Sequence, residues 1–170
     1  MILKQIDNTN IDTAVKIQNT IFPEYSARIN YEESISKINN ATYYLVIEED
    51  SIIGITGIYS TDSENVWLGW FGVLEKYRRR GYGSKIINKF EEIAKEQGFK
   101  YVRLYTDKYD NDIAINFYKA NGYIEEDYLC EDDPDSKKYP ILIFSKSLYN
   151  KSLPLWNNKN IDLTMQMTKQ

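Results

Sequence analysis

The sequence predicts one mixed α/β domain of three layers, in which helices cover both faces of a largely antiparallel, twisted sheet. Along the chain of 170 residues, the hydrophobic pattern changes repeatedly between the period of a strand and that of a helix. Three β-rich segments follow one another between residues 42 and 74 across short polar turns, which indicates an antiparallel meander. A helix and another strand come next, and this crossover makes the strands on either side of it parallel neighbours.

The N-terminal part is expected to contain one strand and two helices. A short apolar run predicts a strand at residues 2–6. Isoleucines and a valine at helical spacing predict a helix over about residues 10–21, which ends before Pro23. A second helix is expected over residues 31–38, because Asn30 stands at a cap position before two acidic residues of the first turn.

The central part is expected to hold the meander and the crossover helix. The three β-rich segments of the meander are residues 42–49, 51–60 and 65–74. From Tyr82 onward the apolar residues take the helical period, and Gly98 suits the position just after the end of that helix.

The C-terminal part continues with a strand at residues 101–107 and a helix over residues 111–122. Two further strands are expected at residues 123–130 and 139–148, separated by a polar, acidic turn. These elements complete the predicted sheet.

We divide the chain into a domain of residues 1–148 and an extension of residues 149–170. Apolar and polar residues alternate at 163–167, which is typical of an edge strand, although a disordered tail is the alternative. Pro154 and Trp156 are expected to pin the connection against the core. The extension either packs on the domain or contributes to a homodimer.

The amino-acid composition excludes several kinds of site. The chain has no histidine, which removes the commonest general base, the commonest metal ligand and every histidine-containing catalytic triad. We therefore expect no metal and assign any proton transfer to carboxylates, tyrosine, lysine, cysteine or water.

Composition also indicates where the protein works. Cys130 is the single cysteine, so no intramolecular disulfide can form and a reducing, cytoplasmic location is expected. The N-terminus becomes polar after a few residues and no later apolar run is long enough to cross a bilayer, so we expect no membrane association.

One short segment carries the clearest functional signal: residues 78–80 are three adjacent arginines, followed by Gly81 and Gly83 and then by a predicted helix. Adjacent arginines repel one another and glycines loosen the backbone, so the segment is better explained by an anionic ligand than by stability. The unpaired N–H groups and the positive dipole end of a helix N-terminus suit a phosphate group.

Other phosphate and nucleic-acid motifs fit this segment poorly. A dinucleotide fingerprint needs a third glycine where Ile86 stands, and the loop of the nucleoside triphosphatases is absent. The RNA-binding signature that begins at Arg80 fails after Gly83. A net charge of -4 also argues against nucleic acid as a partner.

The segment resembles the acetyl-coenzyme A binding motif of the GCN5-related N-acetyltransferase (GNAT) superfamily, [Q/R]-x-x-G-x-[G/A]. A second family pattern, N-x-x-A-x-x-F-Y-x-x-x-G-[F/Y], is matched downstream without a gap. The residues that match the two patterns are Arg78, Gly81 and Gly83, and then Asn111, Ala114, Phe117, Tyr118, Gly122 and Tyr123. The order of elements also resembles the family over about residues 1–147.

The resemblance implies a fold and a cosubstrate. The strands at 65–74 and 101–107, the fourth and fifth of the fold, are expected to run parallel and to splay apart, opening a slot for acetyl-coenzyme A. Backbone N–H groups would hold the pyrophosphate, and the edge of the earlier strand would bind the pantetheine arm. The implied coenzyme-binding residues are Phe71, Val73, Arg78, Arg79, Arg80, Gly81, Gly83, Ser84 and Asn111. For Asn111, a role as a helix cap is the alternative.

The resemblance also implies a general acid. Tyr118 is the family position that protonates the departing thiolate, and a phenol with a pKa near 10 is protonated at neutral pH. A core aromatic is the alternative in a chain with 15 tyrosines. An amine must lose a proton before attack, and the candidate bases are Glu24, Glu32, Glu33 and Asp107. Aromatic residues expected to line the acceptor pocket are Tyr25, Tyr31, Trp67, Trp70 and Tyr105.

The expected activity is transfer of an acetyl group from acetyl-coenzyme A to a primary amine, within a direct ternary complex. The acceptor is a small molecule or a peptide, and polyamines, aminoglycosides, amino acids and protein N-termini all stay open. A domain that binds or senses acyl-coenzyme A without catalysis is the alternative.

Overall fold

The computed structural model describes residues 1–60, 62–128, 140–156 and 168–169. The strands are β1 (Ile2–Gln5), β2 (Tyr25–Ser26), β3 (Ala41–Glu48), β4 (Ser51–Ser60), β5 (Asn65–Val73), β6 (Tyr101–Asp107), β7 (Ile124–Asp127), β8 (Ile141–Ser147) and β9 (Thr168–Lys169). The α-helices are α1 (Ile11–Ile21), α2 (Arg28–Ile35), α3 (Tyr82–Glu96) and α4 (Asp112–Ala120), and a short 3-10 helix, η1 (Glu75–Tyr77), precedes α3.

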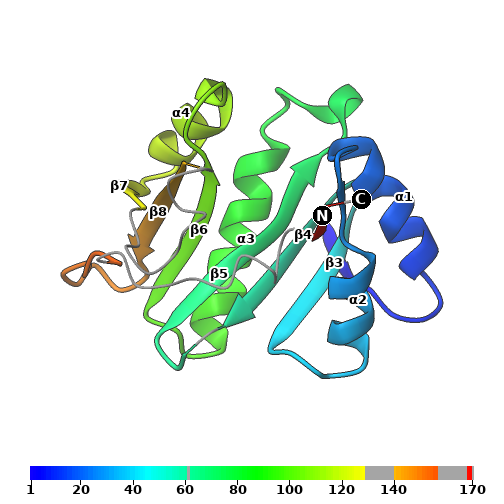
Figure 1. Ribbon diagram of the computed structural model, residues 1–170, viewed down its shortest axis with the longest axis horizontal. Helices are drawn as coiled ribbons and strands as arrows, with labels where there is room; N and C mark the ends of the chain where they lie inside the picture. Colours follow the sequence, from blue (N-terminus) through cyan, green and yellow to red (C-terminus); the bar gives the residue numbers. More distant parts are fainter. Residues whose placement is uncertain (61, 129–139, 157–167, 170) are drawn as a thin grey trace.

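A seven-stranded sheet forms the middle layer, in the order β1-β3-β4-β5-β6-β8-β7 (Figure 1). The pair β5 and β6 is parallel, and the other neighbours in this sheet are antiparallel. One buried core lies between the sheet and α1 with α2, and a second lies between the sheet and α3 with α4. The predicted three-layer α/β fold is therefore confirmed.

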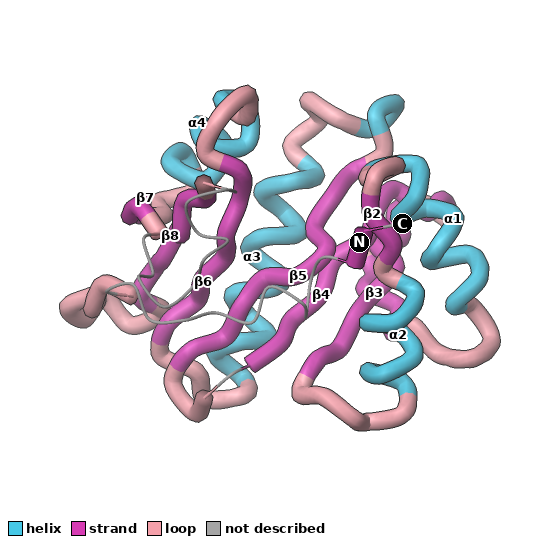
Figure 2. The backbone as a smooth tube through the Cα atoms, viewed as in Figure 1, coloured by secondary structure: helices cyan, strands magenta, loops and turns pink. Residues whose placement is uncertain are grey.

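The parallel pair stays together for only a short distance. Its register joins residues 65–67 of β5 to residues 101–103 of β6, although β5 continues to Val73 and β6 to Asp107. Beyond that point the two strands diverge toward the ends from which the chain leads to α3 and α4 (Figure 2). A slot between strands requires this kind of separation, because paired strands leave no backbone group free.

A β-bulge bends β5 where it leaves its parallel partner. Ile55 pairs with Gly72 and Gly57 pairs with Gly69, so Trp70 and Phe71 together face one residue of β4. Trp70 has φ 44°, a left-handed conformation that is costly for a large side chain. The bulge redirects the strand and sends the two aromatic side chains toward different cores, Trp70 to the α1 side and Phe71 to the α3 side.

Glycines allow β4 and α1 to approach β5 closely next to this bend. A Cβ atom on Gly54 would lie 2.2 Å from the Gly72 carbonyl oxygen, and one on Gly72 would lie 2.5 Å from Cγ2 of Ile21. The C-terminal end of α1 can therefore rest directly on β5 next to the bulge.

Helix α2 differs from the prediction, because it begins at Arg28, ahead of Tyr31, and ends at Ile35. The cap position is occupied by Ala27, so the expected cap at Asn30 was wrong. Asn30 lies inside the helix, 1% exposed, where its side chain accepts a hydrogen bond from the Trp70 indole. The preference of asparagine for caps was overridden by this tertiary contact.

The beginning of the C-terminal extension packs on the sheet. Arg103, 2% exposed, donates hydrogen bonds to Asn65 Oδ1 at 2.6 Å, Ser145 Oγ at 2.7 Å and the Pro154 carbonyl at 2.9 Å. The ring of Trp156 meets the ring of Trp67 edge-on, with centroids 4.9 Å apart. Strand β9 pairs antiparallel with β2. The edge strand expected at 163–167, the acidic turn and Cys130 lie outside the described residues.

A partly buried ion pair ties α3 to the last strands of the sheet. Lys146 Nζ lies 2.8 Å and 2.9 Å from the two carboxylate oxygens of Glu91 and donates to the Asn121 carbonyl at 3.0 Å. Tyr123 also donates to Glu91 at 3.2 Å. Asn121 directly follows α4, so this network fixes the end of that helix.

Replacing Lys146 by methionine is expected to lower the free energy of unfolding by about 2 kcal/mol, because it leaves the Glu91 carboxylate buried without its cation. Lys119→Met is the matched control, because its pair with Glu125 is solvent-exposed and should change stability by less than about 0.5 kcal/mol. Urea denaturation of both variants measures the difference, and equal midpoints would contradict the role given to the pair of Lys146 and Glu91.

No helix among the described residues is both long and apolar enough to span a membrane.

Candidate active site

The N-terminus of α3 forms an anion cradle from backbone alone. Gly81 occupies the cap position with φ 77°, and Arg79 before it has φ 60°. None of the backbone N–H groups of residues 79–84 donates a hydrogen bond to another described residue. Six consecutive free amides at a helix N-terminus make a site that suits a phosphate or pyrophosphate group.

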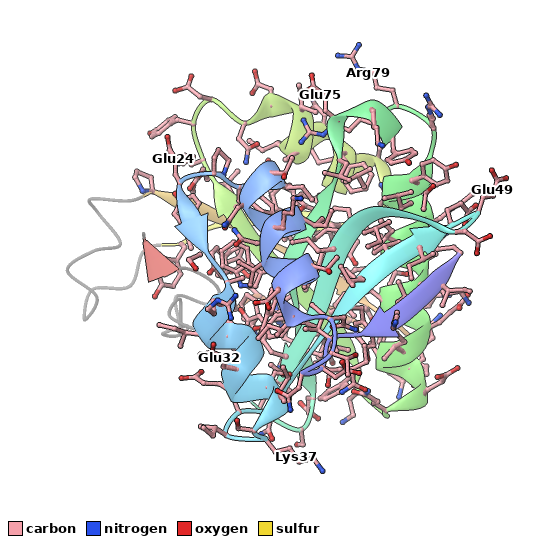
Figure 3. The ribbon with its side chains drawn as sticks, turned by 90° about the vertical axis from the view of Figure 1, so that its right-hand side faces the viewer. Glu24, Glu32, Lys37, Glu49, Glu75 and Arg79 are labelled. Carbon is pink, nitrogen blue, oxygen red and sulfur yellow. The ribbon has the colours of Figure 1, made fainter. Side chains whose placement is uncertain are left out.

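The side chains of the three arginines next to this cradle point in different directions. Arg78 is exposed but directed back at the sheet, because its Nε donates to the Val73 carbonyl at 2.9 Å. Arg79 and Arg80 are exposed, and Figure 3 shows Arg79 pointing away from the protein at the outer end of the preceding turn. The charges of Arg79 and Arg80 are therefore accessible to a polyanion from solvent. Arg78 lies beside the last residue of β5.

Gly83 lets two aromatic rings close against the first turn of α3. A Cβ atom there would lie 3.0 Å from Cε2 of Phe117. The rings of Phe117 and Phe71 are stacked, with centroids 5.8 Å apart. These rings connect α4 to the bulge of β5 and form an apolar side to the space between β5 and the anion cradle.

A cavity of about 160 Å³ occupies the place where β5 and β6 diverge. Its lining residues are Phe22, Tyr25, Leu68, Trp70, Phe71, Leu104, Tyr105, Thr106, Asp107 and Tyr118. Four of them, Leu68, Phe71, Leu104 and Tyr118, belong to the core on the α3 and α4 side. Phe22, Tyr25, Trp70 and Tyr105 belong to the core under α1 and α2. Residues from both faces of the sheet therefore line the cavity.

Tyr118 stands on the α4 side of this cavity and is 8% exposed. Its ring packs among four others, those of Phe71, Phe117, Tyr123 and Phe144. Burial raises the pKa of its phenol, so the hydroxyl keeps its proton throughout the neutral range. That hydroxyl has no hydrogen-bond partner among the described residues. Tyr118 is thus a core aromatic whose polar end is available to a ligand in the cavity.

Asp107 is the one carboxylate in the cavity lining. It is the last residue of β6, and its side chain is exposed at the mouth. Desolvation by the surrounding protein nevertheless raises the pKa of this carboxyl. A raised carboxyl pKa makes the ionised form a stronger base.

Asn111 shapes the turn that follows Asp107. It precedes α4 at the cap position, but its side chain makes no cap hydrogen bond. Its Nδ2 instead donates to Thr106 Oγ1 at 2.5 Å and to the Asp107 carbonyl at 3.4 Å. The cap position expected for Asn111 is therefore occupied, although the side-chain bond typical of a cap is replaced by a bond to the end of β6.

The three glutamates considered as bases lie outside the cavity lining. Glu24 and Glu32 are exposed, and Figure 3 shows Glu24 at the edge of the protein. Arg28 lies 3.5 Å from Glu32, and Asn39 Nδ2 donates to Glu33 at 3.2 Å. Of the four candidates, the structure brings only Asp107 into the cavity.

The aromatic candidates divide in the same way. Tyr25, Trp70 and Tyr105 line the cavity, whereas Tyr31 and Trp67 are fully buried and do not. Tyr31 packs edge-on against Tyr43, and Trp67 stacks on Tyr59.

Sequence reasoning did not select four of the lining residues, Phe22, Leu68, Leu104 and Thr106. Leu68 and Leu104 directly follow the last pair of residues that joins β5 to β6, where these two strands separate. The expected splay was a signal that could have found both leucines. Phe22 follows α1 directly, and its place depends on how that helix docks on β5.

The chain resembles known acetyltransferases in sequence and in fold. It is 35% identical to Probable N-acetyltransferase 14 of Xenopus tropicalis over 79 residues, a match that spans 46% of this chain but only 38% of that relative. An aminoglycoside 6'-N-acetyltransferase complexed with coenzyme A superposes with a TM-score of 0.66 at 17% identity, covering 89% of this chain and 99% of the other. Ard1 from Thermoplasma volcanium gives a TM-score of 0.66 at 24% identity, covering 86% of this chain and 96% of the other.

The family model agrees with both the motifs and the geometry. It matches residues 11–123, a span that contains α1, the bulged strand β5, the cradle before α3 and the helix that carries Tyr118. This match covers more than half of the 170 residues. The protein therefore belongs to the acetyltransferase (GNAT) family.

Proposed function

We propose that the protein transfers an acetyl group from acetyl-coenzyme A to a primary amine while both substrates are bound. The observation that carries this proposal is the cavity between β5 and β6, which has Tyr118 on one face of the sheet and aromatic rings on the other. Asp107 follows Tyr105 by two residues in β6, so it shares the face of that ring. An acid and a base on opposite sides of one cavity suit an acyl transfer between two substrates. The similar aminoglycoside enzyme, whose structure contains coenzyme A, acetylates an amine.

Acetyl-coenzyme A fits the groups on the α3 side. The free amides of residues 79–84 would hold its pyrophosphate, with Arg79 and Arg80 adding positive charge. The edge of β5 at Phe71 and Val73 has no strand partner on the side of β6, although Arg78 donates to the Val73 carbonyl. This edge would hydrogen-bond the amides of the pantetheine arm. Coenzyme bound in this way would direct its thioester toward the cavity.

Two side chains would then move the protons of the reaction. Asp107, directly or through a water, takes a proton from the ammonium so that the nitrogen lone pair can attack the thioester carbon. A C–N bond forms, the nitrogen releases its second proton to water, and the C–S bond breaks so that its electron pair leaves with sulfur. Tyr118 donates its proton to the thiolate and is later reprotonated from solvent. The products are an amide and free coenzyme A.

Acetyl-coenzyme A titration by calorimetry, followed by a thiol-release assay across polyamines, aminoglycosides, amino acids and peptides, tests this function. Saturable binding with thiol release on one amine class is expected. Binding without release on any amine would favour a sensing domain, and failure to bind acetyl-coenzyme A would overturn the proposal.

Replacing Gly81 by valine is expected to weaken acetyl-coenzyme A binding by about tenfold, because a β-branched residue disfavours φ 77° and the cradle must change shape. Gly98→Val is the matched control, because Gly98 lies just beyond the other end of α3 and has φ 84°. At both glycines, the position that a Cβ would take has no other atom within 4 Å. Calorimetry of the two folded variants compares the dissociation constants. An equal loss in both would show that strain in α3, rather than the cradle, sets the affinity.

A further inference from the structure

Gln18 of α1 holds the loop that follows this helix. It is 0% exposed, and its Nε2 donates to the carbonyls of Phe22 at 3.2 Å and Tyr25 at 2.9 Å. Its Oε1 accepts from the Ala27 amide at 3.1 Å. One buried side chain thus satisfies three backbone groups between α1 and α2. Buried backbone groups without partners are costly, so the path of this loop depends on Gln18.

Asn30 of α2 holds the indole of the bulge residue. Its Oδ1 accepts from Trp70 Nε1 at 3.0 Å, and both side chains are buried. The backbone of Trp70 is in an unfavourable conformation, which persists only where neighbouring contacts fix it. Within the described residues, this hydrogen bond and an edge-on contact with Phe22, at 5.6 Å between centroids, are two such contacts.

The two amides act on one surface. Phe22, Tyr25 and Trp70, which we term the aromatic wall, line the cavity from the α1 and α2 side. Gln18 fixes the backbone of the first two residues, Asn30 fixes the side chain of the third, and Phe22 touches Trp70. The anion cradle and Tyr118 lie on the other side of the sheet and contact neither amide.

We propose that Gln18 and Asn30 are positioning residues that hold the aromatic wall in the shape that receives the acceptor amine. This inference rests on the proposed function, because it assigns the wall to the acceptor and not to the coenzyme. Flat rings beside the Asp107 carboxylate suit the apolar body and the charged head of an alkylammonium ion. Neither amide contacts the reacting groups, so each acts through the rings that it holds.

Steady-state kinetics with Gln18→Met and Asn30→Leu test the positioning role. Each variant keeps the side-chain size but removes the hydrogen bonds, and KM for the amine is expected to rise by about tenfold. The dissociation constant of acetyl-coenzyme A should stay within about twofold of that of the parent protein. Asn30→Asp keeps an acceptor oxygen for the Trp70 indole and should restore most of the amine affinity.

Asn10→Leu is the matched control. Asn10 is another buried amide of the α1 region, but it bonds to Gln5 and Asp7 and does not reach the cavity. This control should lower the melting temperature without raising KM for the amine. Equal KM values in all variants, or a rise in the control as large as in the others, would overturn the proposal.

Hydrogen exchange separates this inference from the proposed function, because it needs no substrate. In Gln18→Met the amides of residue 22 and residues 24–27 should exchange at least about tenfold faster, while those in the middle of α3 keep their parent rates. Unchanged exchange at 22–27 overturns the role of Gln18 whether or not an amine is acetylated. If Gln18→Met does not fold, Asn30→Leu with tryptophan fluorescence decides, and an unchanged emission spectrum counts against the proposal.

Discussion

Tyr118→Phe is expected to lower kcat by about 100-fold and to leave the affinity for acetyl-coenzyme A unchanged. The substitution removes one oxygen from a buried ring and keeps its contacts with four neighbouring aromatic rings. Without that oxygen, the thiolate must depart unprotonated or take a proton from water. A loss of about 100-fold is about 2.7 kcal/mol of transition-state stabilisation. Stopped-flow or thiol-release kinetics at saturating substrates measures the change.

The matched control is Tyr123→Phe. Tyr123 is a second buried phenol of the same cluster, with its ring 6.2 Å from that of Tyr118, but its hydroxyl donates to Glu91 and it does not line the cavity. This variant should lose stability while keeping kcat. If Tyr118→Phe turns over as fast as the parent, Tyr118 is a core residue only and the thiolate finds its proton elsewhere.

The pH dependence of the parent should agree with this role. Burial raises the pKa of Tyr118 above that of an ordinary phenol, near 10, so the acid form persists at every pH below the ordinary value. No loss of kcat through deprotonation of Tyr118 is therefore expected between about pH 7 and about pH 9.5. A descending alkaline limb in that range, absent from Tyr118→Phe, would contradict the raised pKa.

The central strands were predicted well because both of their faces are largely buried and their sequences are rich in apolar and β-branched residues. The segments 51–60 and 101–107 coincide with β4 and β6, and each is bounded by polar turns. The helix from Tyr82 was equally clear, since its period is strong and glycines stand at both ends. These signals are local, because each can be recognised within one short segment of the sequence.

Features that depend on tertiary contacts could not be predicted in the same way. Trp70 adopts φ 44° against its own preference, so no propensity indicates the bulge that separates β5 from β6. Asn30 is a residue type typical of caps, but it binds the Trp70 indole from inside α2. Strand β2 has two residues, too few for any period to be visible. The slot that these features shape was foreseen through the family resemblance, not from propensity.

Dependence on tertiary contacts also explains which residues of the candidate site could be predicted. The family resemblance implied Tyr118 and the cradle of residues 79–84, since its motifs lie on a turn and on helices that are local in the sequence. The base and the acceptor-facing residues depend on which side chains the splay exposes. Four carboxylates were equal candidates in the sequence, and three of them face solvent or other partners outside the cavity.

Asp107→Asn is expected to lower kcat/KM for the amine by about 100-fold near neutral pH, because an amide cannot accept the proton of the ammonium. Desolvation raises the pKa of Asp107 above its ordinary value, about 3.9. The carboxylate form is lost as pH falls through this raised pKa, so the acidic limb of the parent should lie at higher pH than that of an ordinary aspartate. In Asp107→Asn this limb should disappear, leaving only the rise caused by deprotonation of the free amine, whose pKa is about 10.4 for an alkylamine.

Asp110→Asn is the matched control for this carboxylate. Asp110 is an exposed residue of the same loop with φ 56°, which asparagine tolerates, and it lies outside the cavity lining. Profiles of kcat/KM from about pH 5 to about pH 10 distinguish the two carboxylates. An acidic limb that persists in Asp107→Asn, or an equal loss in Asp110→Asn, would assign proton removal to solvent and leave Asp107 with an electrostatic role at the mouth.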